Sequence, residues 1–283
     1  LPNRRLLHDR LQQSMAASAR SGKYRALLYL DLDHFKNLND THGHAMGDRL
    51  LIEMAQRLRT CVREGDTVAR LGGDEFVLLV QQLDEDLETA VAQAGRIGDK
   101  VVAQLSQPCA IGAVQYQGSA SVGVSMFLGH ALGTDELLKR ADLAMYQAKA
   151  AGRNTVRFFD PAIQARLNAR AALEADLRQA VQRNELVLHY QPQVDTQGRC
   201  LGVEALVRWE HPQRGQVQPL DFIPLAEETG LILPIGQWVL CQACRTMAAW
   251  EADPRLAGLG MAVNVSARQF HQPDFVHNVR EQL

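Results

Sequence analysis

The stretch 70–80, which reads RLGGDEFVLLV, constrains the fold more than any other segment of the chain. Between two apolar runs, at 67–71 and 76–80, it holds two glycines and two acids: Gly72, Gly73, Asp74 and Glu75. A Gly-Gly pair between strand-like runs predicts a β-hairpin, because glycine reaches positive φ without steric cost. Acids crowded at the end of a sheet are costly unless something positive lies beside them. The segment therefore predicts a tight turn that carries a charged site.

Length and charge narrow the classes of function. A chain of 283 residues suits one large domain or two medium ones. The formal charge of −2 at pH 7 provides no general basic surface, so we expect no nucleic-acid polymer as a partner. An anionic ligand would have to be held by a local cluster of cations.

The cysteines indicate a reducing cellular compartment. Five cysteines, an odd and scattered set at 61, 109, 200, 241 and 244, favour reduced thiols and a cytoplasmic location. Cys241 and Cys244 form a CxxC pair with no second Cys/His pair at zinc spacing, so packing is favoured over the alternative of metal or redox chemistry.

The longest apolar window, 231–240, contains Pro234 and Gly236 and is far shorter than a membrane span. We therefore expect no membrane contact within this chain. Because residue 1 is Leu, we expect a piece of a longer protein, whose anchor or sensor would lie upstream.

The first 160 residues mix strand-like and helix-like patterns. Strands are predicted at 24–32, 67–71, 76–80 and 154–159, and helices at 48–63, 87–105 and from 134 until Gly152. A second hairpin is predicted from 109–116 and 119–127. Thr134 is expected to cap the last helix, ahead of two acids in its first turn. Hairpins among helices predict an α/β domain with a mixed sheet rather than an all-parallel one.

A charge-rich helix predicted at 161–184 is interpreted as a linker. Beyond it, strands are predicted at 185–190, 202–209 and 260–265, with a helix at about 235–250. Strands separated by helices suggest a βα repeat.

The predicted topology gathers acids at one edge of the first sheet. Asp31 and Asp33 end the strand 24–32, while Asp74 and Glu75 lie on a hairpin that could pair beside it, so up to four carboxyls meet there. Packed carboxylates repel, and a hard divalent cation such as Mg²⁺ is the usual resolution. A cation beside glycine-exposed backbone N–H groups suits nucleotide phosphates. The alternative, which a lone Asp-Glu pair would favour, is a solvated acidic turn.

Five segments together resemble the GGDEF family, the diguanylate cyclases. They are LPNRRLL at 1–7, DLDHFKNLNDTHGHAMGD at 31–48, RLGGDEF at 70–76, SVGVS at 121–125 and ADLAMYQAKAAGRN at 141–154. The resemblance covers roughly 1–160 and implies a palm-like nucleotidyl-cyclase fold. The implied reaction joins two GTP molecules into cyclic di-GMP and releases pyrophosphate, with each 3′-hydroxyl attacking the other α-phosphate. Because one domain grips one GTP, a homodimer is also implied.

The resemblance assigns roles to individual residues. Asp31, Asp74 and the Leu32 carbonyl would hold Mg²⁺ or Mn²⁺, and Glu75 could assist metal binding or deprotonation, which makes Asp74 and Glu75 the catalytic candidates. Seven positions match substrate contacts: Lys36, Asn39, Asp48, Gly72, Gly73, Lys149 and Arg153.

Within that set, Asn39 and Asp48 match positions that hydrogen-bond guanine. The cations Lys36, Lys149 and Arg153 match phosphate contacts. Lys149 and Arg153 are four residues apart and are expected to share a face at the end of the last helix. The alternative for this pair is that both cations satisfy the helix dipole.

A further pair, Arg63 and Asp66, lies just upstream of the glycine turn. RxxD at this spacing resembles the family's inhibitory site for its product, in which Arg can grip a phosphate or guanine and Asp can accept from guanine. Arg96 is a candidate second contact. Taken alone, the pair would be an ordinary salt bridge at a helix end.

The second part of the chain resembles EAL-family cyclic di-GMP phosphodiesterases, which are (βα)8 barrels. The resemblance rests on YQPQ at 190–193, EALVRW at 204–209, FIPLAEETGLI at 222–232 and NVS at 264–266. It implies Glu204 and Asn264 as metal ligands and Gln191 and Arg208 as contacts to the dinucleotide. Strand ends at one face of such a barrel commonly carry the catalytic groups.

The EAL resemblance is incomplete. A whole barrel needs about 250 residues, whereas this part runs from 185 to 283. The family's later acidic ligands and its catalytic lysine have no counterpart here, so we expect no hydrolysis by this chain. Half a barrel also exposes a sheet edge that favours misfolding or aggregation. The expected organisation is therefore a cyclase domain at 1–160, a linker helix at 161–184 and an incomplete barrel at 185–283.

Three functional readings follow. In the first, 1–160 is a working diguanylate cyclase. In the second, the intact parent mainly hydrolyses cyclic di-GMP and uses the first domain as a GTP-sensing regulator. In the third, the chain is a non-catalytic cyclic di-GMP receptor that binds through Arg63 and Asp66. The acids at 74 and 75 speak against the third reading, because a receptor has no need of them.

Overall fold

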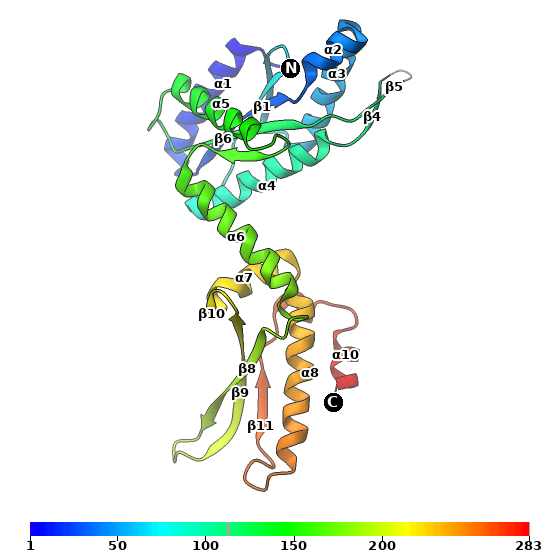
Figure 1. Ribbon diagram of the computed structural model, residues 1–283. Helices are drawn as coiled ribbons and strands as arrows, with labels where there is room; N and C mark the ends of the chain where they lie inside the picture. Colours follow the sequence, from blue (N-terminus) through cyan, green and yellow to red (C-terminus); the bar gives the residue numbers. More distant parts are fainter. Residues whose placement is uncertain (112–113, 283) are drawn as a thin grey trace. The chain divides into compact units, whose positions relative to one another are not determined.

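The computed structural model of the protein describes residues 1–111 and 114–282, and Figure 1 shows its helices and strands. The chain divides into two compact units, Leu1–Leu167 and Asn168–Leu283. The division falls inside helix α6 (Pro161–Ala180), within the segment interpreted as a linker. In the described residues, no helix is both long and apolar enough to cross a membrane.

A five-stranded sheet forms the centre of the first unit, in the order β2-β3-β1-β6-β7. Its strands are β1 (Arg25–Leu32), β2 (Thr67–Gly72), β3 (Glu75–Val80), β6 (Ala120–Phe127) and β7 (Val156–Phe158). Strand β1 pairs antiparallel with β3 and β6, whereas β7 runs parallel to β6. The predicted mixed sheet is confirmed, and so is the hairpin around the two glycines.

Helices cover both faces of this sheet (Figure 1). Helices α1 (Arg4–Ser21) and α5 (Thr134–Ala150) pack on one face; α2 (Phe35–His42), α3 (His44–Cys61) and α4 (Leu87–Leu105) lie over the other. Strand β1 shows how two cores arise, because successive side chains point to opposite faces. Leu28 and Leu30 belong to the core under α3 and α4, while Leu27 and Tyr29 belong to the core under α1 and α5.

The backbone of helix α5 packs directly against Gly123 of β6. A Cβ atom added at Gly123 would lie 2.0 Å from the Ala141 carbonyl oxygen and 2.1 Å from the Met145 nitrogen. Because both atoms are backbone, a side chain here would force α5 away from the sheet. Gly123, in the SVGVS segment, therefore allows α5, the helix that carries Lys149, to pack close to the sheet.

The second predicted hairpin is wrong. Strand β4 (Cys109–Ile111) pairs with β5 (Val114–Tyr116), while β6 joins the central sheet between β1 and β7. Residues 112–113, between β4 and β5 in the chain, lie outside the described residues. The run 120–127 is buried along almost its whole length, and a central position in a sheet satisfies such a strand better than an edge.

Several helices differ from the prediction; α3, for example, begins at His44 rather than at 48. Helices α1 and α2 were not predicted as helices, although Leu7, Leu11 and Met15 give α1 a buried stripe. Thr134 is the first residue of α5 and does not cap it; Gly133 occupies the cap, and the Thr134 hydroxyl is hydrogen-bonded to His8 Nε2 at 2.8 Å. The tertiary contact to α1 therefore takes the hydroxyl that the sequence pattern assigned to the cap.

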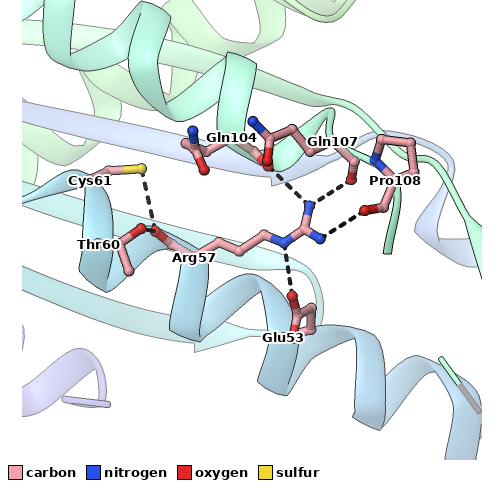
Figure 2. Close-up of polar contacts among 7 residues, drawn as sticks. All are labelled: Glu53, Arg57, Thr60, Cys61, Gln104, Gln107 and Pro108. Atoms are coloured by element: carbon pink, nitrogen blue, oxygen red, sulfur yellow. Dashed lines mark hydrogen bonds and ion pairs between the residues drawn. The ribbon is translucent and has the colours of Figure 1, made fainter. Parts of the chain in front are cut away.

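Arg57 ties α3 to the end of α4 (Figure 2). Its guanidinium donates to the carbonyl oxygens of Gln104, Gln107 and Pro108 at 3.0, 2.6 and 3.1 Å, and its Nε lies 2.9 Å from Glu53 Oε1. The last carbonyls of a helix have no intrahelical partners. One side chain therefore satisfies the end of α4 and the segment that leads into β4.

The second unit begins with an antiparallel pair rather than a βα repeat. Its elements are β8 (Leu186–Val194), β9 (Cys200–His211), β10 (Gly215–Val217), α7 (Pro219–Thr229), α8 (Ile232–Glu251), β11 (Gly260–Val263), α9 (Ala267–Phe270) and α10 (Phe275–Gln282). Strands β8 and β10 pair antiparallel with β9, and β11 pairs with β9 in parallel. Only after β9 does the strand–helix–parallel strand pattern of the predicted barrel begin.

The core of the second unit includes the end of the predicted linker. Trp209 and Phe222 are fully buried with their rings 5.7 Å apart, and Leu177 and Ala180 of α6 are buried in the same cluster. The Trp209 indole N–H donates to Glu185 Oε2 at 3.0 Å. The last turns of α6 are therefore part of this unit's packing.

Candidate active site

The glycine turn and the end of β1 lie side by side. Asp31 faces Glu75 in the β1–β3 register, and the Leu32 N–H donates to the Asp74 carbonyl oxygen at 3.4 Å. Gly73 has a φ of 50°, which a side chain would disfavour. The Arg70 guanidinium donates to the Gly73 carbonyl oxygen at 3.0 and 2.7 Å and closes the turn. The predicted meeting of the two acidic segments therefore occurs.

Asp31 already has a cationic partner. Lys149 Nζ on α5 lies 2.7 Å from Asp31 Oδ1, and both side chains are largely buried. Burial raises the pKa of the Asp31 carboxyl, and the negative charge of Asp74 raises it further, while the bond to Lys149 acts in the opposite direction. The site therefore holds two interacting carboxylates, one of which is neutralised by the protein itself.

Asp33 does not belong to this group of acids, which corrects the expectation of four carboxyls. Its side chain is only 2% exposed and accepts hydrogen bonds from Ser119 Oγ at 2.7 Å, Ser121 Oγ at 2.8 Å and the Asn154 N–H at 3.2 Å. A buried carboxylate that accepts three hydrogen bonds has a structural role. Asp33 holds β6 and the segment after α5 against the end of β1.

Glu75 points to the α1–α5 side of the sheet. Tyr29, two residues before Asp31 on the same face of β1, lies near enough to Glu75 for its hydroxyl to interact with that carboxylate. Burial, and then the charge of Glu75, raise the pKa of the Tyr29 hydroxyl. Sequence reasoning missed Tyr29, although the period-two alternation of a strand places it beside Asp31 and Glu75.

Oxygen ligands for a divalent cation are present, but they are few. The described residues contain no group of three or more His, Cys, Asp or Glu side chains that could hold a metal. The donors at the turn are the carboxylates of Asp31 and Asp74 and the Leu32 backbone carbonyl. In the described residues the Asp74 side chain has no hydrogen bond or ion pair. Such hard oxygen donors suit Mg²⁺, which usually keeps several waters and substrate oxygens as its other ligands.

The predicted guanine contacts lie at the junction of α2 and α3. Asn39 is on α2, Asp48 is on α3, and Gly43 is the single residue that separates the two helices. Asn39 Oδ1 is buried without a hydrogen-bond partner in the described residues, which is costly for an acceptor. Asp48 is exposed. With its oxygen buried, Asn39 has its NH₂ group left to meet a ligand, and the exposed Asp48 carboxylate can accept N–H donors.

The predicted phosphate contacts are arranged differently from expectation. Lys149 is in the last turn of α5, but the helix ends at Ala150 and Arg153 lies beyond it with a φ of 64°. The two cations therefore do not share a helix face. Lys36 is exposed on α2. The positions where Cβ atoms would lie on Gly72 and Gly73 have no atom within 4 Å, so the turn is open to a ligand.

The RxxD pair lines a separate cavity of about 490 Å³. Arg63 and Asp66 form part of its wall, and Arg96 of α4 lines it from the other side. The Asp66 carboxylate accepts from the backbone N–H groups of Arg63 at 3.0 Å and Gln81 at 2.9 Å. Lys100 donates to the Cys61 carbonyl oxygen at 3.2 Å and holds α4 against the end of α3. The three predicted residues are therefore brought together.

In the second unit, three of the four predicted EAL residues meet. Gln191 on β8 faces Glu204 on β9, and the Asn264 side-chain N–H donates to Glu204 Oε1 at 2.7 Å. Arg208 lies four residues further along β9 and donates to the Val207 carbonyl oxygen. Cys241 and Cys244 are unpaired thiols on α8.

Comparison with known protein families divides the chain in the same order. A family model for the diguanylate cyclase GGDEF domain matches residues 1–155, and one for the EAL domain matches residues 174–283.

Curated relatives carry both regions. MucR of Pseudomonas aeruginosa, named a bifunctional diguanylate cyclase/cyclic di-GMP phosphodiesterase, is 48% identical over 284 aligned residues, which cover 100% of this chain and 40% of MucR. PdeR of Escherichia coli, named a cyclic di-GMP phosphodiesterase, is 37% identical over 269 residues, covering 95% of this chain and 39% of PdeR. The chain thus spans about two fifths of the length of these relatives.

Solved structures of GGDEF domains resemble the first part of the chain. The GGDEF domain of YfiN (TpbB) from Pseudomonas aeruginosa has a TM-score of 0.52 at 37% identity, and the match covers 56% of this chain and 96% of that one. The GGDEF domain of DgcB from Caulobacter crescentus, solved in complex with cyclic di-GMP, has a TM-score of 0.50 at 26% identity, covering 56% and 89%.

Proposed function

The chain belongs to the GGDEF family, with an EAL region after its GGDEF domain, and from this premise we propose that residues 1–160 form one half of a diguanylate cyclase active site. The proposed substrate is GTP and the proposed product is cyclic di-GMP. Residues 161–184 would connect this domain to an incomplete phosphodiesterase domain at 185–283. We place the reaction in the cytoplasm.

One observation carries the proposal. The Asp74 turn is hydrogen-bonded to the end of β1 beside Asp31, and Lys149 reaches Asp31 from α5. Two carboxylates, a cation and an open glycine turn in one place are the groups that a metal-bound triphosphate requires. A solvated acidic turn would need neither the buried ion pair nor the adjoining β1 acid.

The metal-binding residues in this proposal are Asp31, Asp74 and the Leu32 carbonyl. Bound Mg²⁺ would neutralise charge at the α-phosphate and lower the pKa of the attacking hydroxyl. Lys149, Lys36 and Arg153 would hold phosphate oxygens, and Gly72 and Gly73 would let the triphosphate approach the backbone.

The reaction is an in-line displacement. The 3′-hydroxyl oxygen of one GTP forms a bond to the α-phosphorus of the other, the bond from that phosphorus to the bridging oxygen breaks, and pyrophosphate leaves. Two such steps close the ring, and each releases one proton. In this proposal Glu75 is the residue that accepts it. Because each site holds one nucleotide, two copies of the chain must face each other.

A direct assay tests this proposal. The purified chain is incubated with GTP and Mg²⁺, and cyclic di-GMP is measured as the protein concentration rises. We expect product that disappears in Asp74→Ala and persists in Glu85→Ala, an exposed acid outside the site. No product from a demonstrably dimeric sample, or equal product from Asp74→Ala, would refute the cyclase.

Product binding is the second element of the proposal. The cavity between Arg63, Asp66 and Arg96 offers cations and a carboxylate to a cyclic dinucleotide, which carries phosphates and guanine edges. We propose that cyclic di-GMP binds there and slows the enzyme. If the chain were only a receptor, this binding would remain and the assay above would give no product.

A second candidate function concerns a longer protein that contains this chain. The bond between Asn264 and Glu204, with Gln191 opposite, brings together the residues that an EAL phosphodiesterase would use to hold metal and dinucleotide. In that candidate the longer protein mainly hydrolyses cyclic di-GMP, and its GGDEF domain senses GTP. Measuring both activities in the longer protein, with Asp74→Ala and Glu204→Ala separately, would decide the net direction.

A further inference from the structure

Gly47, in the first turns of α3, lies directly against the side chain of Asn39. It is buried, and a Cβ atom built on it would lie 2.0 Å from Asn39 Oδ1, 3.0 Å from Asn39 Cγ and 3.1 Å from Phe35 Cζ. A real side chain cannot occupy these positions while the Asn39 amide stays where it is. The Asn39 amide therefore occupies the volume that a Cβ atom at position 47 would need.

Backbone geometry does not account for a glycine at this position. Gly47 has helical rather than positive φ, and its N–H donates to the Gly43 carbonyl oxygen in the first turn of α3. Alanine is a better helix former than glycine, because it loses less conformational entropy on folding. Local stability alone would therefore favour alanine at position 47.

A Cβ atom at position 47 could be accommodated at little cost in folding free energy. The atom nearest to the added Cβ is the end of the Asn39 side chain, which can rotate, whereas the buried Phe35 ring needs to give way by only a few tenths of an ångström. Rotation of Asn39 would move its buried, unpaired oxygen away from its present position. A change at Gly47 should thus leave folding intact and alter what the amide can bind.

We infer that Gly47 is a positioning residue for guanine recognition: by lacking a Cβ it lets the Asn39 oxygen pack against α3, so that the amide NH₂ group is held to donate to the base. This inference rests on the proposed binding of GTP. Guanine presents an O6 acceptor where adenine has an amino donor, so a fixed N–H donor selects guanine. The proposed phosphate contacts at Gly72, Gly73, Lys149 and Arg153 lie on other elements, and Lys36, although on α2, is exposed and is not among the atoms nearest to Gly47.

The test compares nucleotides that differ in the base. Binding of GDP and of ADP, both with Mg²⁺, is measured by calorimetry for the full chain and for Gly47→Ala. We expect GDP to bind Gly47→Ala about tenfold more weakly or worse, which corresponds to about 1.4 kcal/mol, and ADP affinity to change less than twofold. The thermal midpoint without nucleotide should equal or exceed that of the parent chain.

Matched variants separate positioning from a general effect of alanine. Gly95→Ala is the control, because that helical glycine on α4 has only an ordinary contact, 3.9 Å to Leu167. Its GDP affinity should be unchanged. Equal weakening of GDP and ADP in Gly47→Ala, or unchanged GDP binding, would overturn the inference.

A double variant covers the case in which Gly47→Ala fails to fold. In Asn39→Gly the amide is absent, so the Cβ of Gly47→Ala meets no amide. The double variant should therefore fold even if Gly47→Ala alone does not, and its affinity for GDP should equal that of Asn39→Gly. A further loss in the double variant would show that Gly47 acts independently of Asn39 and would also overturn the inference. A parent chain that binds no GDP at all would instead count against the proposed function.

Discussion

Lys149 Nζ lies 2.7 Å from Asp31 Oδ1, so a residue matched to phosphate binding is joined to a residue matched to metal binding. The side chains are 28% and 13% exposed, respectively. Without nucleotide or metal, the ammonium group offsets the cost of keeping Asp31 close to Asp74. Metal and triphosphate would bring their own compensating charges, and Lys149 could then turn to a phosphate oxygen.

Removing Lys149 should destabilise the free protein and increase its response to metal. We expect Lys149→Ala to lose about 1–2 kcal/mol of unfolding free energy in EDTA, because a charge-assisted hydrogen bond is lost and Asp31 is left without its partner. Mg²⁺ should then raise its thermal midpoint more than that of the parent chain, because no ammonium competes for Asp31. Lys139→Ala, an exposed lysine on the same helix, is the control. Identical Mg²⁺ shifts in all three proteins would contradict the prediction.

Substitution by Asn should impair stability at Asp33 and catalysis at Asp74, although both acids lie near the same sheet edge. Asp33→Asn replaces one acceptor oxygen with an NH₂ group among three donors and should lower the unfolding free energy by about 2 kcal/mol. Asp74→Asn should change it by no more than about 0.5 kcal/mol but abolish product formation. Urea unfolding and the cyclase assay provide the two measurements. A stable Asp33→Asn variant would show that the Asp33 network is not needed for stability.

Product inhibition should depend on Arg63. In Arg63→Ala, the inhibition constant of added cyclic di-GMP should rise about tenfold or more, because the cavity loses a guanidinium that can hold phosphate or guanine. Arg59→Ala, exposed on the preceding turns of α3, should be inhibited as the parent chain is. Inhibition that is unchanged in Arg63→Ala would remove the proposed product site.

Arg57 should matter for its shape as well as its charge. Arg57→Lys keeps the positive charge, but an ammonium group cannot donate in one plane to the carbonyls of Gln104, Gln107 and Pro108. We expect a loss of about 2 kcal/mol from the unfolding transition of the first unit. Arg59→Lys should be neutral. A neutral Arg57→Lys would mean that water replaces these bonds at no cost.

Strand patterns and turn chemistry were readable from the sequence. The glycine pair between two apolar runs predicted the β2–β3 hairpin, because that signal is local. The meeting of Asp31 with the Asp74 turn was expected only if the hairpin paired beside the first strand, as β3 does. The predicted second hairpin failed because β6 pairs with β1, more than eighty residues earlier in the chain. Which strand becomes a neighbour depends on burial across the whole sheet rather than on the intervening turn.

The sequence by itself determined the family motifs, the mixed sheet and the residue types at the site. The tertiary structure decided what each acid does: Asp31 pairs with Lys149, Glu75 meets Tyr29, and Asp33 is buried among serine hydroxyls. It also brought Gly47 of α3 against the Asn39 side chain of α2. The physical reason is that a carboxylate or a glycine has no fixed role in itself. Its role follows from the donors, charges and free volume that distant segments bring to it when the chain folds.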